Sequence, residues 1–167
     1  MRVAWVVVDL QHGFETPELY GLAVRVADAV AVEPGPVWAL VQSNPPGGPL
    51  GKLRGWYGST GENAMELLDV ISALAPVIIA KTGYGARADL PVEELGTFDA
   101  VYVVGMDTDA CVLATAFGLF DAGVPVVVRT ELCASSGGAS MHAAAVTILR
   151  RQLGANRVQS HGPGMSH

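Results

Sequence analysis

Short apolar runs rich in β-branched residues alternate along the chain with segments whose apolar residues recur at helical spacing. The apolar runs cover residues 3–8, 37–41, 77–80, 101–104 and 124–128. Continuous runs of this length are typical of strands that are buried on both faces of a parallel sheet. Because such runs alternate with helical segments, the pattern predicts an α/β fold in which helices cover both sides of a parallel sheet.

Start and stop signals delimit the predicted helices. Thr16 as N-cap, with Pro17 in the first turn, indicates a helix start, and Gly123 is a typical C-terminal stop. The predicted helices cover residues 17–32, 62–74, 111–122 and 140–153. Residues 43–59 are rich in Gly and Pro, which favours a long loop. Residues 157–158 are predicted to form a short final strand.

The composition indicates a packed globular protein. The 167 residues contain no linker or internal repeat, so we expect a single domain over residues 1–167. The net charge of -6 and the scattered basic residues argue against nucleic acid as a partner. No apolar run is long enough to cross a membrane, and two cysteines are too few for a disulfide framework. We therefore expect a cytoplasmic protein with free thiols.

The C-terminal tail, residues 160–167, has the composition of a flexible segment. A neighbouring subunit is a candidate for holding such a tail in place. We accordingly expect a homo-oligomer, either a dimer or a tetramer, that takes a small-molecule substrate.

Three candidate reactive side chains follow three of the predicted strands. Asp9 and Lys81 come directly after the first and third apolar runs, and Cys111 follows the fourth run after a turn. Ligands of open α/β sheets bind outside the carboxyl ends of the strands, so we expect these side chains to lie at one edge of the sheet. A carboxylate, an ammonium group and a thiol are a chemically sensible set for hydrolysis.

The position of Cys111 at the start of a predicted helix favours a thiolate, because the positive end of the helix dipole lowers the pKa of a thiol. Lys81 would lower that pKa further. Asp9 could accept the thiol proton and later deliver it to a leaving amine, while backbone N–H groups hold the oxyanion. Taken singly, each residue also has a structural interpretation: a buried core cysteine, an aspartate that caps a loop, and a solvated lysine.

Three segments resemble the motifs of the isochorismatase-like cysteine hydrolases. They are residues 7–14 (Val-Val-Asp-Leu-Gln-His-Gly-Phe), 81–86 (Lys-Thr-Gly-Tyr-Gly-Ala) and 104–112 (Val-Gly-Met-Asp-Thr-Asp-Ala-Cys-Val), the last followed by Thr115-Ala116. Their order and spacing fit the family over residues 3 to about 150. The resemblance implies a three-layer, Rossmann-like α/β fold with a six-stranded parallel sheet flanked by helices.

The resemblance also implies roles for individual residues. Asp9 would be the general base and acid, Lys81 would orient and electrostatically support the site, and Cys111 would attack a carbonyl. A cis peptide bond is implied just before Asp107, in a turn that Thr108 braces and that directs backbone N–H groups at the oxyanion. The implied oxyanion turn comprises Met106, Asp107, Thr108 and Cys111.

The resemblance does not extend to a metal site. Nicotinamidases of this family bind zinc or a similar ion through an Asp-x-His pair after the second strand and a later His. Residues 43–46 read Ser-Asn-Pro-Pro here, and no histidine lies between His12 and His142. We therefore expect no metal and no other cofactor, which argues against a nicotinamidase. The dispersed histidines, for which solvated or capping roles are expected, are His12, His142, His161 and His167.

The residues expected to contact the substrate are Gln11, Phe14, Trp56, Tyr84 and Arg87. Arg87 stands where the family has a Phe, and it either clamps a substrate carboxylate or lies at the surface. The predicted loop over residues 43–59 contains Lys52, Arg54, Trp56 and Tyr57. These aromatic and cationic groups suit a small planar acid or amide, and an exposed loop with an anchoring Trp is the alternative. Gly118, within a predicted helix, favours close packing of a neighbouring element.

These features predict a metal-independent hydrolase that cleaves a C–N bond of a small amide, carbamoyl or ureido compound through a thioester intermediate. The presence of Cys111 favours this reaction, because isochorismate hydrolysis in the family acts on a vinyl ether and does not need the thiol. Vinyl ether hydrolysis remains an alternative, as does a non-catalytic member that binds a metabolite or a partner. A nucleotide-binding Rossmann domain is less favoured, because no Gly-x-Gly-x-x-Gly follows the first strand.

Overall fold

The computed structural model of the chain describes residues 1–14 and 16–160. In this part of the chain, six strands form one parallel sheet in the order β3-β2-β1-β4-β5-β6. They are β1 (Val3–Val8), β2 (Val37–Gln42), β3 (Val77–Lys81), β4 (Ala100–Met106), β5 (Val126–Ala134) and β6 (Val158–Gln159). The predicted α/β class with a six-stranded parallel sheet is confirmed.

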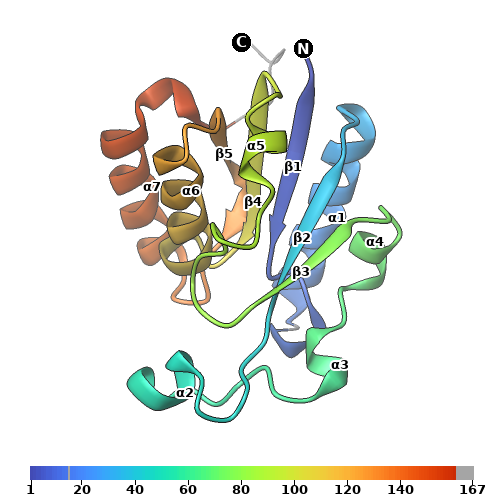
Figure 1. The fold of residues 1–167 in the computed structure, drawn as a ribbon, viewed down its shortest axis with the longest axis vertical. Coiled ribbons are helices and arrows are strands. Elements are labelled where there is room, and N and C mark those ends of the chain that lie inside the picture. Colours follow the sequence, from blue (N-terminus) through green and yellow to red (C-terminus); the bar gives the residue numbers. More distant parts are fainter. Residues whose placement is uncertain (15, 161–167) are drawn as a thin grey trace.

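Helices cover both faces of the sheet (Figure 1). One face carries α1 (Pro17–Val32) and α4 (Asp69–Ser72), and the other carries α5 (Val92–Leu95), α6 (Leu113–Asp121) and α7 (Ala139–Leu153). The predicted start of α1 is confirmed, since the Thr16 hydroxyl accepts a hydrogen bond from the Leu19 backbone N–H at 3.2 Å. The glycine stop is confirmed too, because Gly123 after α6 has a φ of 76°.

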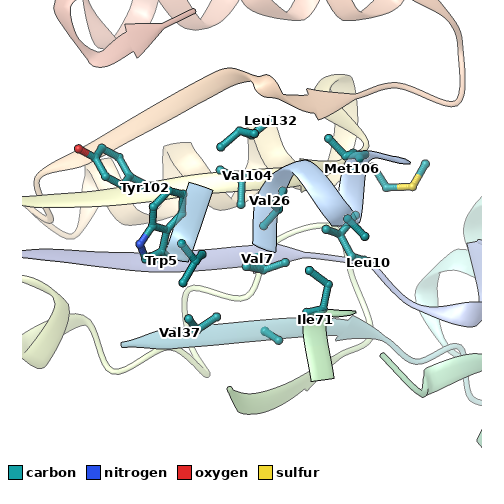
Figure 2. Packing of buried hydrophobic residues seen from close by; sticks show 14 of the residues in the cluster. Trp5, Val7, Leu10, Val26, Val37, Ile71, Tyr102, Val104, Met106 and Leu132 are labelled. Carbon is teal, nitrogen blue, oxygen red and sulfur yellow. The ribbon is translucent and has the colours of Figure 1, made fainter. Parts of the chain in front are cut away.

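Side chains of each strand alternate between the two faces of the sheet, so the core consists of two apolar clusters. From β1, Trp5 and Val7 pack toward α1, whereas Val6 packs toward the opposite layer. Figure 2 shows the cluster on the α1 side, which includes Val26 of α1 and Ile71 of α4. Burying one such side chain stabilises the fold by about 1.5–3 kcal/mol. All of β1 is buried, which holds its carboxyl end firmly in the middle of the sheet.

The connection between β2 and β3 is more structured than the loop predicted over residues 43–59. It contains α2 (Pro49–Arg54), which begins at a proline and is followed by Gly55 with a φ of 71°. Proline at the first position and a left-handed glycine after the last are ordinary helix boundary signals. The local sequence therefore carried the boundary signals of α2, although the overall Gly and Pro content of residues 43–59 favoured a loop.

The single helix predicted over residues 62–74 is wrong. The structure has α3 (Glu62–Met65) and α4, with an extended segment between them. In that segment the Glu66 carbonyl accepts from the His12 N–H at 2.9 Å, and the Leu68 N–H donates to the Leu10 carbonyl at 3.1 Å. Pairing with the chain that follows β1 thus replaces the helical hydrogen bonds that local periodicity suggested.

Several other boundaries differ from the prediction. β5 continues to residue 134, beyond the predicted 128, because it pairs with β4 past a register shift near Gly105. β3 is an edge strand, and its residues Val77 and Ile78 are 56% and 58% exposed rather than buried. α5 was not predicted, and the final strand lies one residue later than expected. The structure also contains two short 3-10 helices, η1 (His12–Phe14) and η3 (Ala155–Arg157).

Of the predicted flexible tail, residues 161–167 lie outside the described part of the chain. Within the described residues, no helix combines the length and the apolar character needed to span a bilayer.

Candidate active site

The carboxyl edge of the sheet brings Asp9, Lys81 and Cys111 together. Asp9 follows β1, Lys81 ends β3, and Cys111 lies in η2 (Thr108–Val112), a π-helical turn that leads into α6. Lys81 Nζ lies 2.9 Å from Asp9 Oδ2 and 3.3 Å from Cys111 Sγ. The exposed fractions are only 1% for Asp9, 2% for Lys81 and 9% for Cys111. In Figure 1 this edge is the lower one, where the strands point toward α2 and α3.

Lys81 is held by two oxygens besides the Asp9 carboxylate. Its ammonium group donates to Gln42 Oε1 at 2.5 Å and to the Gly83 carbonyl at 3.2 Å. An ammonium group has three protons, so these three oxygens satisfy it and leave Cys111 in contact with the positive charge. Gln42 pairs in register with Lys81, and its amide donates to the Ser43 and Lys81 carbonyls. The sequence interpretation missed Gln42. A polar residue at the carboxyl end of an apolar strand could have indicated that Gln42 belongs to the site.

Asp9 is a buried carboxylate in a strained backbone position. Its φ of 55° is in the left-handed region that non-glycine residues seldom adopt. Burial raises the pKa of Asp9 above its ordinary value of 3.8, and the charge of Lys81 acts in the opposite direction. Asp9 Oδ1 accepts no hydrogen bond from the residues that the structure describes. A desolvated carboxylate oxygen without a donor is well suited to accept a proton.

The thiol of Cys111 does not have the lowered pKa expected from its place near a helix start. Burial and the neighbouring Asp9 charge raise the pKa of Cys111 to about 12, and the charge of Lys81 offsets only part of this rise. Removal from water disfavours the thiolate more than the nearby cation favours it. A nucleophilic role for this thiol would therefore require a base beside it.

The turn before Cys111 is braced from two directions. The peptide bond between Met106 and Asp107 is cis, at the place that the family resemblance implies. Thr108 is fully buried, and its hydroxyl forms a 2.8 Å hydrogen bond with His142 Nδ1 on α7. The Asp107 carboxylate accepts from the Ser136 backbone N–H and hydroxyl at 2.7 and 2.8 Å. His142, expected to be solvated or to cap a helix, instead joins α7 to the turn that carries Cys111.

Only some N–H groups of this turn are available to an oxyanion. The N–H groups of Ala110 and Val112 both donate to the Asp107 carbonyl, at 3.1 and 3.0 Å. The Met106 side chain packs into the core on the α1 side and, like Thr108, does not line the cavity next to Cys111. The oxyanion role of residues 106–108 and Cys111 therefore stays a prediction about their backbone.

A cavity of about 540 Å³ opens beside Cys111. The residues that line this cavity include Cys111, Gln42, Phe14, Trp56, Tyr84 and Arg54. The rings of Phe14 and Trp56 are stacked, with centroids 5.7 Å apart and planes 12° from parallel. Three residues expected to contact a substrate, Phe14, Trp56 and Tyr84, thus line the same cavity as the thiol. From the connection predicted as a loop, the residues that line this cavity are Leu50, Arg54, Trp56 and Gly58.

Two residues expected to contact a substrate do not line this cavity. Gln11 is fully buried, and its amide nitrogen lies within hydrogen-bond distance of Gln42 O, Ser59 Oγ and Ala64 O. Its amide oxygen accepts from the Gln42 N–H, so Gln11 anchors the β2–β3 connection instead. Arg87 is exposed and packs on α6, where a Cβ at Gly118 would lie 3.0 Å from that of Arg87. Gly118 therefore provides the close packing that the sequence suggested, and Arg87 takes the surface alternative.

The described residues do not supply a metal-binding set. No group of three or more His, Cys, Asp or Glu side chains in residues 1–14 and 16–160 is arranged to hold an ion. After β2, Asn44 uses its amide to donate to the Trp56 and Gly58 carbonyls at 2.9 and 3.1 Å. The residue types and their existing hydrogen bonds thus do not fit the zinc site of the nicotinamidases.

Residues 3–161 match the model of the isochorismatase domain. The chain belongs to the isochorismatase family. This membership covers the three motif segments and supports a hydrolase activity. Comparison with curated proteins gives no match.

Solved structures of this family share the fold. The nicotinamidase of Bacillus subtilis superimposes with a TM-score of 0.77 at 21% identity, over 96% of this chain and 100% of that one. The N-carbamoylsarcosine amidase of Thermoplasma acidophilum has a TM-score of 0.74 at 23% identity, over 92% and 94%. The zinc complex of the Pyrococcus horikoshii pyrazinamidase has a TM-score of 0.71 at 18% identity, over 95% and 98%. At these identities the likeness establishes the fold alone.

Proposed function

We propose that this protein is a metal-independent cysteine hydrolase that cleaves a C–N bond of a small amide, carbamoyl or ureido compound. The observation that carries the proposal is the position of Lys81 Nζ, within 3.3 Å of both the Asp9 carboxylate and the Cys111 thiol beside a cavity. A nucleophile, a base and a cation that supports both are the groups that acyl transfer needs. Two structural relatives are named as an N-carbamoylsarcosine amidase and a nicotinamidase, which supports this class of substrate.

In the proposed reaction, Asp9 takes the proton of Cys111 as Sγ attacks the substrate carbonyl carbon. The carbonyl π electrons move to oxygen, and backbone N–H groups of the turn before Cys111 stabilise the resulting oxyanion. When the oxyanion collapses, the C–N bond breaks and Asp9 returns its proton to the leaving nitrogen. A water molecule, deprotonated by Asp9, then attacks the thioester, which releases the acid and regenerates the thiol.

Lys81 has an electrostatic role in this scheme. Its ammonium group stabilises the developing thiolate and favours the charged form of Asp9, in a site where burial opposes both charges. Gln42 and the Gly83 carbonyl hold that ammonium group in position. The scheme therefore needs no metal ion to create a nucleophile.

The test is a panel of amides, ureides and N-carbamoyl acids assayed for release of ammonia or amine, with intact-mass detection of an acyl adduct on Cys111. We expect Cys111→Ala to lower turnover by more than about a thousandfold, because the attacking atom is lost. Cys133→Ala is the matched control, since Cys133 is buried and does not line the cavity. Full activity of Cys111→Ala, with its fold verified by circular dichroism, would falsify the mechanism.

Vinyl ether hydrolysis is the second candidate, and the raised pKa of Asp9 is the observation that favours it. A carboxyl group that stays protonated to a higher pH is suited to protonate an enol ether carbon. In that reaction Asp9→Asn is inactive, whereas Cys111→Ala keeps its turnover. A non-catalytic member of the family would show neither turnover nor an acyl adduct with any compound of the panel.

A further inference from the structure

Arg54 is a cation without a hydrogen-bond or ion-pair partner among the described residues, and it lines the cavity that contains Cys111. It is the last residue of α2 and lines this cavity. With the residues that the structure describes, its guanidinium group makes no hydrogen bond and no ion pair. Lys52, on the same helix, lines a different cavity of about 750 Å³ that contains neither Cys111 nor Asp9. The two cations of α2 therefore have different surroundings, and only Arg54 lines the cavity that contains the thiol.

The carboxylates of the same cavity are already engaged by the chain. Both oxygens of Asp107 accept hydrogen bonds from Ser136. Asp109 accepts a hydrogen bond from the hydroxyl of Ser135. Among the described residues that line this cavity, Arg54 is thus the charged group whose hydrogen-bond donors are all available.

The segment that follows Arg54 is fixed in place and presents an apolar surface. The Trp56 N–H donates to the Leu50 carbonyl at 2.9 Å, and the Trp56 carbonyl accepts from the Asn44 amide at 2.9 Å. Phe14 stacks on Trp56 with 5.7 Å between ring centroids, which leaves no room for a ligand between the rings. The two rings therefore form one continuous apolar wall near Arg54.

We propose that the substrate of this site carries a carboxylate, which Arg54 binds, and an apolar or planar portion that lies against Phe14 and Trp56. The planar fork of a guanidinium group matches a carboxylate with two parallel hydrogen bonds. Asp107 and Asp109 repel an anion, so the carboxylate lies on the Arg54 side of the cavity. This assignment rests on the proposed function only in taking Cys111 as the attacking atom.

The first experiment compares an N-carbamoyl amino acid with the analogue whose carboxylate is replaced by a carboxamide. We expect wild type to prefer the carboxylate in kcat/KM, and Arg54→Gln to lower that preference by roughly tenfold to a hundredfold, mainly through KM. Arg54→Lys should retain part of the preference, because it keeps the charge but loses the bidentate geometry. Lys52→Gln removes the same charge from the same helix and should leave the preference unchanged.

The second experiment needs no turnover. Iodoacetate and iodoacetamide differ only in a carboxylate or a carboxamide, and both alkylate a thiol by forming an S–C bond, with loss of iodide and of the thiol proton to a base. The ratio of their rates at Cys111, normalised to the ratio for glutathione at the same pH and salt, reports how well the cavity attracts a carboxylate. Peptide mass spectrometry separates modification at Cys111 from modification at the buried Cys133.

A normalised ratio above that of glutathione, lowered about tenfold by Arg54→Gln but not by Lys52→Gln, supports the carboxylate site. A ratio that Arg54→Gln leaves unchanged, or that both variants lower equally, overturns it, because the effect is then absent or reflects net charge alone. If the ratio behaves as expected while no compound of the panel is turned over and no acyl adduct forms, the proposed hydrolase function fails and the carboxylate site stands.

Discussion

Cys111 and Asp9 are buried next to each other, and burial raises the pKa of both groups. Each negative charge is disfavoured away from water, so the state in which the thiol and the carboxylate share one proton is favoured over the state in which both are charged. Lys81 favours either negative charge, since its ammonium group contacts both side chains. Activation of the thiol in the proposed mechanism therefore depends on proton transfer to Asp9, and not on a permanently low thiol pKa.

The pH dependence of kcat/KM tests this account. Asp9 must be charged to accept the thiol proton, and its raised pKa keeps it protonated to a higher pH than an ordinary aspartate. We therefore expect activity to fall as the pH is lowered through that raised pKa, with an acid limb clearly above pH 3.8. Asp9→Asn should be inactive at every pH, while Asp9→Glu should move the limb. An acid limb at the ordinary aspartate pKa would contradict the role of burial.

Thr108 and His142 provide a second test at the level of single side chains. Their 2.8 Å hydrogen bond joins the turn that carries Cys111 to α7, so we expect it to position the nucleophile. Thr108→Val and His142→Phe should each lower kcat by about tenfold with little change in KM. The kcat of the double variant should be no lower than that of the less active single variant. Steady-state kinetics of the four proteins measures this coupling. Additive losses in kcat would contradict the coupling, and losses that appear only in thermal stability would assign the bond a structural role.

Local signals place some elements correctly, whereas long-range hydrogen bonds decide others. Thr16 and Gly123 mark helix boundaries by hydrogen bonds and backbone angles within a few residues of themselves. The break between α3 and α4 has no such local cause, because residues 66–68 bond to residues 10–12. The Gly and Pro content of residues 43–59 suggested a loop, although Pro49 and Gly55 are also the boundary signals of α2.

Two glycines with positive φ allow a matched test of how the elements pack. A Cβ at Gly105, in β4, would lie 2.2 Å from the Val8 carbonyl oxygen, whereas a Cβ at Gly123 would meet nothing within 4 Å. Gly123→Ala should therefore lower the free energy of unfolding by about 1–2 kcal/mol, the cost of the left-handed backbone. Gly105→Ala should lower it by roughly 3 kcal/mol or more, since β1 and β4 must also separate. Urea unfolding compares them, and equal losses would contradict the close approach.

At the scale of the whole molecule, strand order determines where the chemistry lies. β1 is in the middle of the sheet, between β2 and β4, and β3 is at the edge next to β2. Asp9 and Lys81 are 72 residues apart in the chain, and Lys81 and Cys111 are 30 apart, yet all three meet at one edge. All strands of a parallel sheet have their carboxyl ends on the same side of the sheet, so this meeting follows from topology.

The sequence by itself determined the α/β class, most strand and helix positions, and the three residues at the strand ends. These follow from apolar periodicity, capping residues and motif spacing, which are properties of neighbouring residues. Only the tertiary structure decided that Gln11 is an anchor, that Gln42 holds Lys81, and that Arg54 rather than Arg87 lines the cavity. It also reversed the expected pKa shift of Cys111. Burial and side-chain partners come from segments distant in the chain, and spacing along the sequence does not encode them.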